Sequence, residues 1–500
     1  MSVFRTKSVE QSIRDTDEPE YQLKKRLTAL DLTVFGIGVI IGAGIFTVTG
    51  RAALVYAGPS IVLSFVLGAI CCGLAALCYA EFASTVPVSG SAYTFSYASL
   101  GEIIAWIIGW DLLLELMLGA SVVAQGWSQY ADLFLGKIGI DWPDSLGSGA
   151  HFDLLAFLLV AVLTVLVSIG IKESLRVNLV LVCIKVFIVL FVIVAGAGFV
   201  NSANWTPFIP PSAPNAPGAE GIHAPVLQVL TGMTPATYGV MGIMSAAALV
   251  FFAYIGFDVV ATTAEEARDP QRALPIGILG SLAICTVLYV AVALVITGMV
   301  PFDQIDTQGA LAAAFEQVGQ DGYATLIAAG AVAGLTTVVM TLIIGTTRVV
   351  FAMSRDRLLP AGLGVTSQRT GTPVRLTFLV GAVIALVASL TPVGRLEEMV
   401  NIGTLTAFVL VSLAVPILRK RRPDLKRGFV VPWNPVLPWL SAALCVYLIL
   451  NLSIETWLRF LVWMVAGVVI YFTYSRSHSL LATGEREAGL AETPQILDVD

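Results

Sequence analysis

Two ionisable side chains stand inside long apolar stretches of this chain and could move protons. Lys185 lies in LVCIKVFIVLF, and Glu115 lies in WDLLLELML, four residues after Asp111. Charged groups inside a membrane span are costly and are functional candidates by default. A desolvated lysine could load and release a proton near neutral pH and so couple a solute's movement to a proton gradient. Alternatively, Lys185 extends its ammonium to the membrane surface.

Glu115 shares a helix face with Asp111, because residues four apart are neighbours on a helix. It falls near the middle of its predicted span. Three roles remain open: pairing with Lys185, lining a substrate cavity, or hydrogen-bonding a neighbouring helix while protonated. The sequence alone does not choose among them.

A glycine-rich stretch, GIGVIIGAGIFTVTG at 36–50, interrupts the first apolar run. Glycine is a poor helix former, and Gly42-Ala43-Gly44 falls ~18 Å into the membrane, near its middle. A helix broken there would aim the free N–H groups of its outer half at the membrane centre, where they suit a carboxylate. The alternative is a glycine face that packs helices together.

The run at 240–263 carries a matching interruption, FFAYIGFD at 251–258. Its outer half would end near Phe252, so that free carbonyls face the centre and suit an ammonium group. Asp258 could cap the inner half-helix. Paired interruptions at corresponding positions of two halves point to a transporter site. N–H groups from one break and carbonyls from the other suit a zwitterion such as an amino acid.

These interruptions require membrane helices to position them, and the composition agrees. The 500 residues are 57% hydrophobic and 12% charged, and runs of the ~20 apolar residues that cross a bilayer recur throughout. We predict an all-α polytopic membrane protein in which spans 1–5 and 6–10 form inverted repeats and two helices follow. The twelve predicted spans are 30–56, 60–83, 93–130, 153–171, 178–200, 240–263, 274–298, 321–354, 374–391, 396–418, 435–453 and 456–475.

Lysines and arginines predict the orientation, since they gather in cytoplasmic loops. With both termini cytoplasmic, 22 of the 28 fall on the cytoplasmic side and four on the other. We expect a plasma-membrane protein without a removable signal peptide, disulfide, metal site or cofactor. The predicted segments are a cytoplasmic tail at 1–26, a first repeat at 27–200, an extracellular loop at 201–239, a second repeat at 240–419, the last two helices and their preceding loop at 420–475, and a cytoplasmic tail at 476–500.

Several longer motifs occur in order: GIGVIIGAGIF, PVSGSAYTFSY, LLLEL, FFAYIGFD, AEEARDPQRALPIGI, RVVFAMSRDRLLP and NIGTLTAF. In these motifs the chain resembles the amino acid–polyamine–organocation superfamily, and within it bacterial relatives of the cationic amino acid transporters. The resemblance covers roughly residues 22–475. It implies the five-plus-five inverted-repeat fold, transport by alternating access, and an amino acid substrate. Besides that substrate and the bilayer we expect no nucleic acid, and no partner subunit is predicted.

The resemblance also implies the site residues. The substrate carboxylate would meet the first break, the amino group would meet the second, and Lys185 would couple transport to protons, with Glu115 as a further candidate. Leu335 falls where relatives line the side-chain pocket. The substrate residues implied are Ile40, Gly42, Ala43, Gly44, Ile45, Phe252, Ala253, Ile255 and Leu335.

Two departures shape the expected substrate. Ala43 stands where some relatives carry threonine, and Leu335 favours a modest apolar side chain. We therefore expect proton-coupled import of small neutral L-amino acids such as alanine, driven by the proton gradient. The alternatives are a transporter of cationic amino acids (arginine or lysine), an exchanger, or a sensor that binds without transport. An enzyme is not expected, because no span carries a nucleophile–base or metal constellation.

Overall fold

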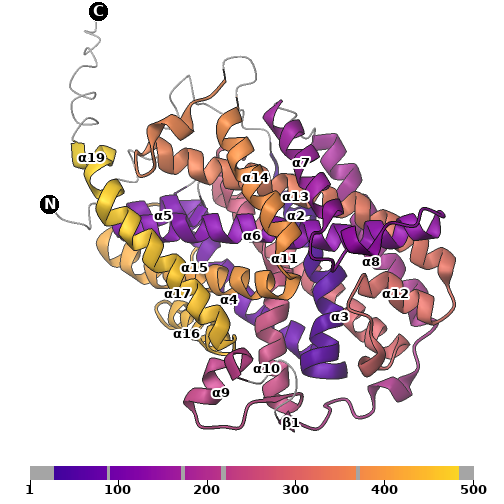
Figure 1. Ribbon diagram of the computed structural model, residues 1–500. Helices are drawn as coiled ribbons and strands as arrows, with labels where there is room; N and C mark the ends of the chain where they lie inside the picture. The colour runs from indigo at the N-terminus through magenta and orange to yellow at the C-terminus, as the bar shows by residue number, and fades with distance from the viewer. Residues whose placement is uncertain (1–26, 87–90, 170–174, 215–220, 368–371, 484–500) are drawn as a thin grey trace, which may run out of the picture.

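The computed structural model describes residues 27–86, 91–169, 175–214, 221–367 and 372–483, and these form an almost wholly helical body (Figure 1). The predicted tail at 1–26 lies outside the described residues, as does the part 484–500 of the predicted tail at 476–500. The long helices are α2 (Ala29–Ile40), α4 (Ile61–Thr85), α6 (Glu102–Lys137), α7 (Leu154–Ser168), α8 (Leu175–Ala197), α10 (Gly239–Val250), α11 (Pro270–Met299), α13 (Asp321–Arg355), α14 (Val374–Leu390), α15 (Val393–Arg421), α16 (Val436–Leu450) and α17 (Ile454–Ile470).

Shorter elements join them. They are α3 (Thr49–Ala52), α5 (Ser91–Ser99), α9 (Val226–Leu230), α12 (Ala310–Gln317), α18 (Arg476–His478), α19 (Leu480–Thr483) and the strands β1 (Ala213–Pro214) and β2 (Ala236–Thr237), which pair antiparallel. Within the predicted loop at 201–239, the residues VLQVL form the short helix α9. Figure 1 draws α9 and β1 at the lower end of the molecule and α19 at the upper left.

Every predicted span is mostly helical in the described chain, although the first, third and sixth are each divided among several helices or helical turns. By length and composition, eight helical segments of that part could cross a membrane, the first being Ala29–Thr85, and three apolar helices are shorter. The exact count of twelve spans stays a prediction. The predicted fold class is confirmed, because the described chain is an all-α polytopic protein.

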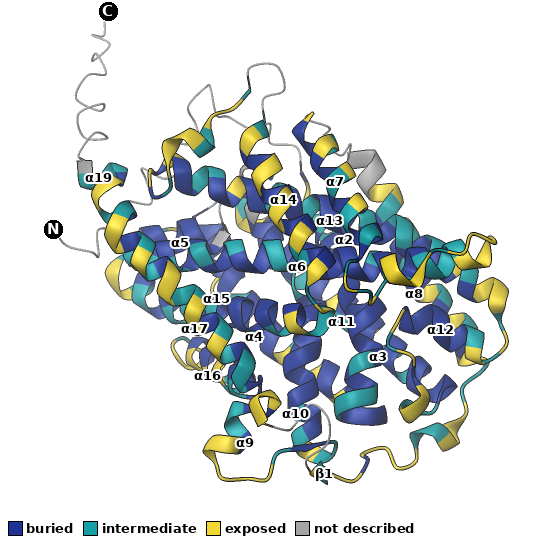
Figure 2. Cartoon of the chain, in the orientation of Figure 1, coloured by how far each residue is buried: buried dark blue, intermediate teal, exposed yellow. Residues whose placement is uncertain are grey.

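The outer surface of the bundle is apolar, as a lipid-facing surface must be. Val194 on α8, Val287 on α11 and Val462 on α17 are each at least 70% exposed. Figure 2 shows the same pattern at larger scale, with exposed residues along the outer faces of α14 and α17 and buried residues inside. In water such a belt would be an aggregation hazard. In a bilayer it is the expected surface, so the chain is a multi-pass membrane protein.

One predicted boundary was wrong. The apolar run at 93–130 predicted a single span, but the structure divides this region into α5 and α6. The division falls at Gly101, whose φ of +107° favours glycine. The Tyr93 hydroxyl of α5 then donates to Asp356 at 2.8 Å. An aromatic segment that looked like the start of a membrane helix is therefore a separate short helix.

An ion pair ties the first predicted span to the tenth. Arg51 of α3 donates to Glu397, near the start of α15, at 2.8 Å, and the Glu397 side chain is only 1% exposed. Gly394 leaves room for this arrangement, because a Cβ there would lie 2.0 Å from the guanidinium. A buried charge is tolerable only with its partner in place.

We expect Glu397→Leu to lower the free energy of unfolding by about 3 kcal/mol, because it leaves the largely buried Arg51 without a counter-charge. The double variant Arg51→Leu/Glu397→Leu should recover most of that loss. The measurement is unfolding of the purified protein in detergent. Asp321→Ala is the control, since its pair with Lys137 is exposed and worth under ~1 kcal/mol. Equal losses in the single and double variants would contradict this account.

Candidate transport site

The two predicted interruptions are real, and they touch. Helix α2 ends at Ile40, and after the bend at Ile41–Gly42 the chain continues as the π-helical turn η1 (Gly44–Val48). In the second interruption α10 gives way to the 3₁₀ turns η7 (Phe251–Tyr254) and η8 (Asp258–Glu266). A Cβ on Gly44 would lie 2.2 Å from the Cα of Ala253. Only glycine permits this backbone-to-backbone contact.

Side chains from other helices satisfy carbonyls freed by the breaks, as an apolar surrounding requires. Lys185 Nζ donates to the Gly38 carbonyl at 2.7 Å, and Tyr289 Oη donates to the Ile40 carbonyl at 2.7 Å. In the second break Asn401 Nδ2 donates to the carbonyls of Ala248 and Leu249 at 2.9 and 3.1 Å. Helices α8, α11 and α15, which are the fifth, seventh and tenth predicted spans, are thus hydrogen-bonded to the breaks.

Helices α6 and α13 form walls beside the first break. A Cβ on Gly126 of α6 would lie 3.0 Å from Thr47, 3.5 Å from Ala43 and 3.9 Å from Leu335. The structure therefore brings Leu335 close to Ala43 of the first break. Its role in the side-chain pocket stays a prediction. A Cβ on Gly42 would meet Val338 of α13 at an ordinary 3.4 Å.

The predicted substrate residues lie close together in the structure. Where Gly44 contacts Ala253, however, the two breaks leave no room for a solute between them. All are buried except Ile255, which is partly buried. At one end of the bundle the N–H of Leu27 donates to Glu266 O, and the N–H of Arg268 to Leu27 O, both at 2.9 Å. At the other end the N–H of Tyr238 donates to Tyr56 O at 2.8 Å. Spans 1 and 6 thus meet at both ends as well as in the middle.

Lys185 is 1% exposed, so it does not extend to the surface. Its stem crosses Gly334 of α13, where a Cβ would lie 2.8 Å from Lys185 Cγ. Of the two alternatives for this residue, the structure supports the buried lysine. Its amino group bonds the last turn of α2, directly before the first break.

Glu115 lies in a different environment from Lys185. Together with Asp111 and Asp258 it interacts electrostatically with the buried Tyr79, which packs against Phe257 and Phe408 at ring-centroid distances of 5.9 and 5.2 Å. Within the described chain, Glu115 Oε1, both carboxyl oxygens of Asp111 and the Tyr79 hydroxyl have no hydrogen-bond partner. No ion pair joins Glu115 to Lys185 among the described residues.

Asp258 is the first residue of η8, and its carboxylate accepts from the N–H of Gly256 at 3.2 Å. Capping of the inner half-helix by Asp258 stays a prediction. Gly256 has a φ of +120°, which only glycine adopts readily. The bond from Gly256 to this carboxylate therefore helps to hold the turn of the break.

Sequence reasoning missed two residues that hold the breaks, Tyr289 and Asn401. Both were visible as single polar side chains in apolar spans, in LAICTVLYVAV and MVNIGTLTAF. A lone polar residue in a span needs a partner. Nothing in the local sequence says that the partner is the backbone of a broken helix.

Comparison with known proteins agrees with this architecture. The amino acid permease family model matches residues 27–474. The chain is 47% identical to the branched-chain amino acid permease BcaP of Bacillus subtilis (strain 168), over 96% of this chain and 99% of that protein. It is 42% identical to the methylthioribose transporter of the same organism, with the same coverage. It is 30% identical to the vacuolar cationic amino acid transporter 4 of Arabidopsis thaliana, over 96% of each chain.

The chain belongs to the amino acid permease family. The relatives that it matches are named as permeases and transporters, not enzymes. Their names differ in the solute, so membership alone leaves the substrate open.

Gly44→Ala should separate the two breaks, because its Cβ would fall 2.2 Å from backbone. We expect a loss of thermal stability worth roughly 1–3 kcal/mol, as for an overpacked core, and loss of solute binding. The measurement is thermal unfolding with and without added amino acid. Gly119→Ala in α6 is the control, since its Cβ would meet only Leu342, at an ordinary 3.7 Å. Similar behaviour of the two variants would show that the contact with Ala253 is unimportant.

Proposed function

We propose that this protein is a secondary active transporter that imports neutral L-amino acids together with protons by alternating access. The observation that carries the proposal is the pair of broken helices in direct contact at the centre of a membrane bundle. Broken helices at membrane depth are tolerated where they are enclosed by protein or line a cavity, and their half-helix ends suit charged solutes.

The two breaks offer complementary chemistry. Backbone N–H groups around Gly42, Ala43 and Gly44 would bind the carboxylate, and carbonyls around Phe252 and Ala253 would bind the ammonium. In the present conformation Gly44 and Ala253 are in direct backbone contact and leave no room for a side chain on Gly44. Binding would therefore begin with their separation, and a solute would replace a backbone contact that only small residues permit.

Alternating access would open one end at a time. The contact of Leu27 with Glu266 and Arg268 would break to open the end that we predict to be cytoplasmic. The contact of Tyr56 with Tyr238 would break to open the opposite end. Both are short backbone contacts, so each can open without unfolding a helix.

Lys185 would couple this movement to protons. Its bond to the Gly38 carbonyl holds the end of α2 that precedes the break. A charged donor makes a stronger hydrogen bond than a neutral one. Loss of the proton would therefore weaken the hold of α8 on the first span and favour a different position of its inner half.

For the substrate, small neutral amino acids such as alanine are the first candidates, because Leu335 narrows the space beside Ala43. Branched-chain amino acids are the second, since one relative is named for them at 47% identity. The methylthioribose transporter at 42% identity shows that such a likeness does not settle the solute. An exchanger, or a carrier of cationic amino acids, remains the alternative.

Lys185→Ala should abolish uptake driven by an inward proton gradient, because the group that senses the proton is gone. The measurement is uptake of labelled alanine and leucine into proteoliposomes as the external pH is lowered. Uptake by the wild-type protein should become faster as the external pH falls, and uptake by the variant should not. Binding without a gradient should persist in the variant.

Lys137→Ala is the matched control, because this lysine pairs with Glu316 and Asp321 at the bundle surface. It should behave as wild type. If wild-type uptake ignores the gradient and requires amino acid inside the vesicle, the protein is an exchanger and coupling through Lys185 is wrong.

Leu335→Ala should widen the site and move the preference from alanine toward larger apolar amino acids. One methylene in an apolar pocket is worth roughly 10–200-fold in discrimination, so we expect the leucine-to-alanine ratio of kcat/KM to rise about tenfold. Competition uptake measures this ratio. Leu342→Ala serves as the control, because it lies two turns away on the same helix. An unchanged ratio in Leu335→Ala would remove Leu335 from the site.

A further inference from the structure

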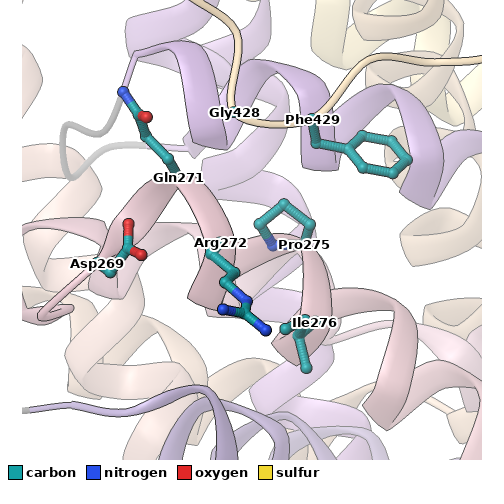
Figure 3. A pocket seen from close by; sticks show the side chains of 7 residues that line it. All are labelled: Asp269, Gln271, Arg272, Pro275, Ile276, Gly428 and Phe429. Carbon is teal, nitrogen blue, oxygen red and sulfur yellow. The ribbon is translucent and has the colours of Figure 1, made fainter.

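A cavity of about 370 Å³ lies at the start of α11, at the end of the bundle that carries the basic loops (Figure 3). One wall is the first turns of α11, with Asp269 just before the helix and Gln271, Arg272, Pro275 and Ile276 within it. The other wall is the loop between α15 and α16, at Gly428 and Phe429. The loop rests directly on the helix, since a Cβ on Gly428 would lie 2.5 Å from Gln271 Cβ.

The loop wall is held in place by α4. The carboxylate of Glu81 accepts from Arg419 and from the N–H of Val431, the latter at 2.8 Å. The N–H of Phe429 donates to Ser84 Oγ at 3.1 Å. The cavity is therefore bounded by a fixed loop and by a long helix.

The charges in the wall are opposite but do not neutralise one another. Arg272 and Asp269 both line the cavity, yet in the described part of the chain neither side chain takes part in an ion pair. The lining also has an apolar part, formed by Pro275, Phe429 and Ile276, and Ile276 is 46% exposed. In chain order, an anion (Asp269), a cation (Arg272) and an apolar edge (Pro275 and Ile276) succeed one another at the start of α11.

This order matches the order of groups in one kind of lipid. A guanidinium binds phosphate well, a carboxylate binds a primary ammonium, and the apolar edge faces the hydrocarbon. Basic pockets between membrane helices at the membrane surface are typical headgroup sites. Asp269 disfavours a purely anionic headgroup, and its need for a hydrogen-bond donor disfavours a quaternary ammonium.

We propose that this cavity binds the headgroup of an aminophospholipid, phosphatidylethanolamine. The phosphate lies on Arg272, the ammonium lies on Asp269, and the acyl chains leave past Ile276. The proposal needs only the membrane placement of the chain. It does not depend on which solute is carried or on Lys185, so the proposed transport activity and this site can fail separately.

The site adjoins the contact that closes this end of the bundle. Asp269 follows Arg268, whose N–H donates to Leu27 O. A headgroup that joins the first turn of α11 to the fixed loop would hold this segment still. Occupancy should therefore stabilise the closed form.

The test is native mass spectrometry of the purified full-length protein with added phosphatidylethanolamine, phosphatidylcholine or phosphatidylglycerol. Wild type should bind phosphatidylethanolamine roughly tenfold more tightly than the other two lipids, a difference of about 1.4 kcal/mol. Arg272→Gln should lose this binding. Asp269→Asn should bind phosphatidylethanolamine and phosphatidylcholine equally. Arg348→Gln, an exposed arginine of α13 outside the cavity, should behave as wild type.

Thermal unfolding without lipid shows whether each variant is folded, and Asp269→Asn carries the test if Arg272→Gln is not. Equal binding of the three lipids to wild type would overturn the proposal. So would a preference for phosphatidylglycerol, or a preference for phosphatidylethanolamine that survives both variants. Displacement of the lipid by free alanine at Arg272 would show instead that the cavity is a second amino acid site.

Discussion

Backbone groups cannot remain unpaired inside a membrane, and the centre of this protein is built around that constraint. Two helices are broken at membrane depth, so carbonyls that a continuous helix would pair must find other donors. Lys185, Tyr289 and Asn401 supply them from three different helices. The breaks can exist only because the surrounding helices enclose them. The hydrogen bonds that pair the free carbonyls of the breaks also connect these helices to one another.

The three donors differ in what they can do. Tyr289 and Asn401 bond as neutral groups, and a neutral amide has no proton to exchange near neutral pH. Lys185 is the only one of the three whose charge could change during a transport cycle. Its carbonyl partner belongs to the last turn of α2 before the break, so a change of charge acts on the part of the first span that must move. Glu115 would act on the breaks less directly than Lys185. It lies near Asp111, Asp258 and Tyr79 and does not bond a carbonyl of either break.

Much of the fold and part of the site follow from the sequence. Apolar runs predict the spans, and glycines in otherwise apolar helices predict the breaks, because both signals are local. Leu335 and Lys185 were predicted as site residues from residue type and resemblance. The contact of Gly44 with Ala253, and the bonds of Tyr289 and Asn401, were not predictable in the same way, because they depend on the register between helices far apart in sequence. Gly101 was missed for another reason: a single glycine inside a long apolar and aromatic run does not by itself reveal a turn.

Helix α11 connects the centre of the protein to its surface. Arg272 lies in its first turn beside the cavity, and Tyr289 lies roughly 26 Å further along the same helix, where it holds the Ile40 carbonyl. Distance alone does not couple two sites; an element with two positions that both sites bias is needed. The inner half of the first span fits that description, since it is held by α11 through Tyr289, by α8 through Lys185 and by the backbone contact at Leu27. A headgroup that fixes the start of α11 and a proton on Lys185 would then act on the same segment from two helices. Transport would respond to the lipid without the lipid entering the transport path.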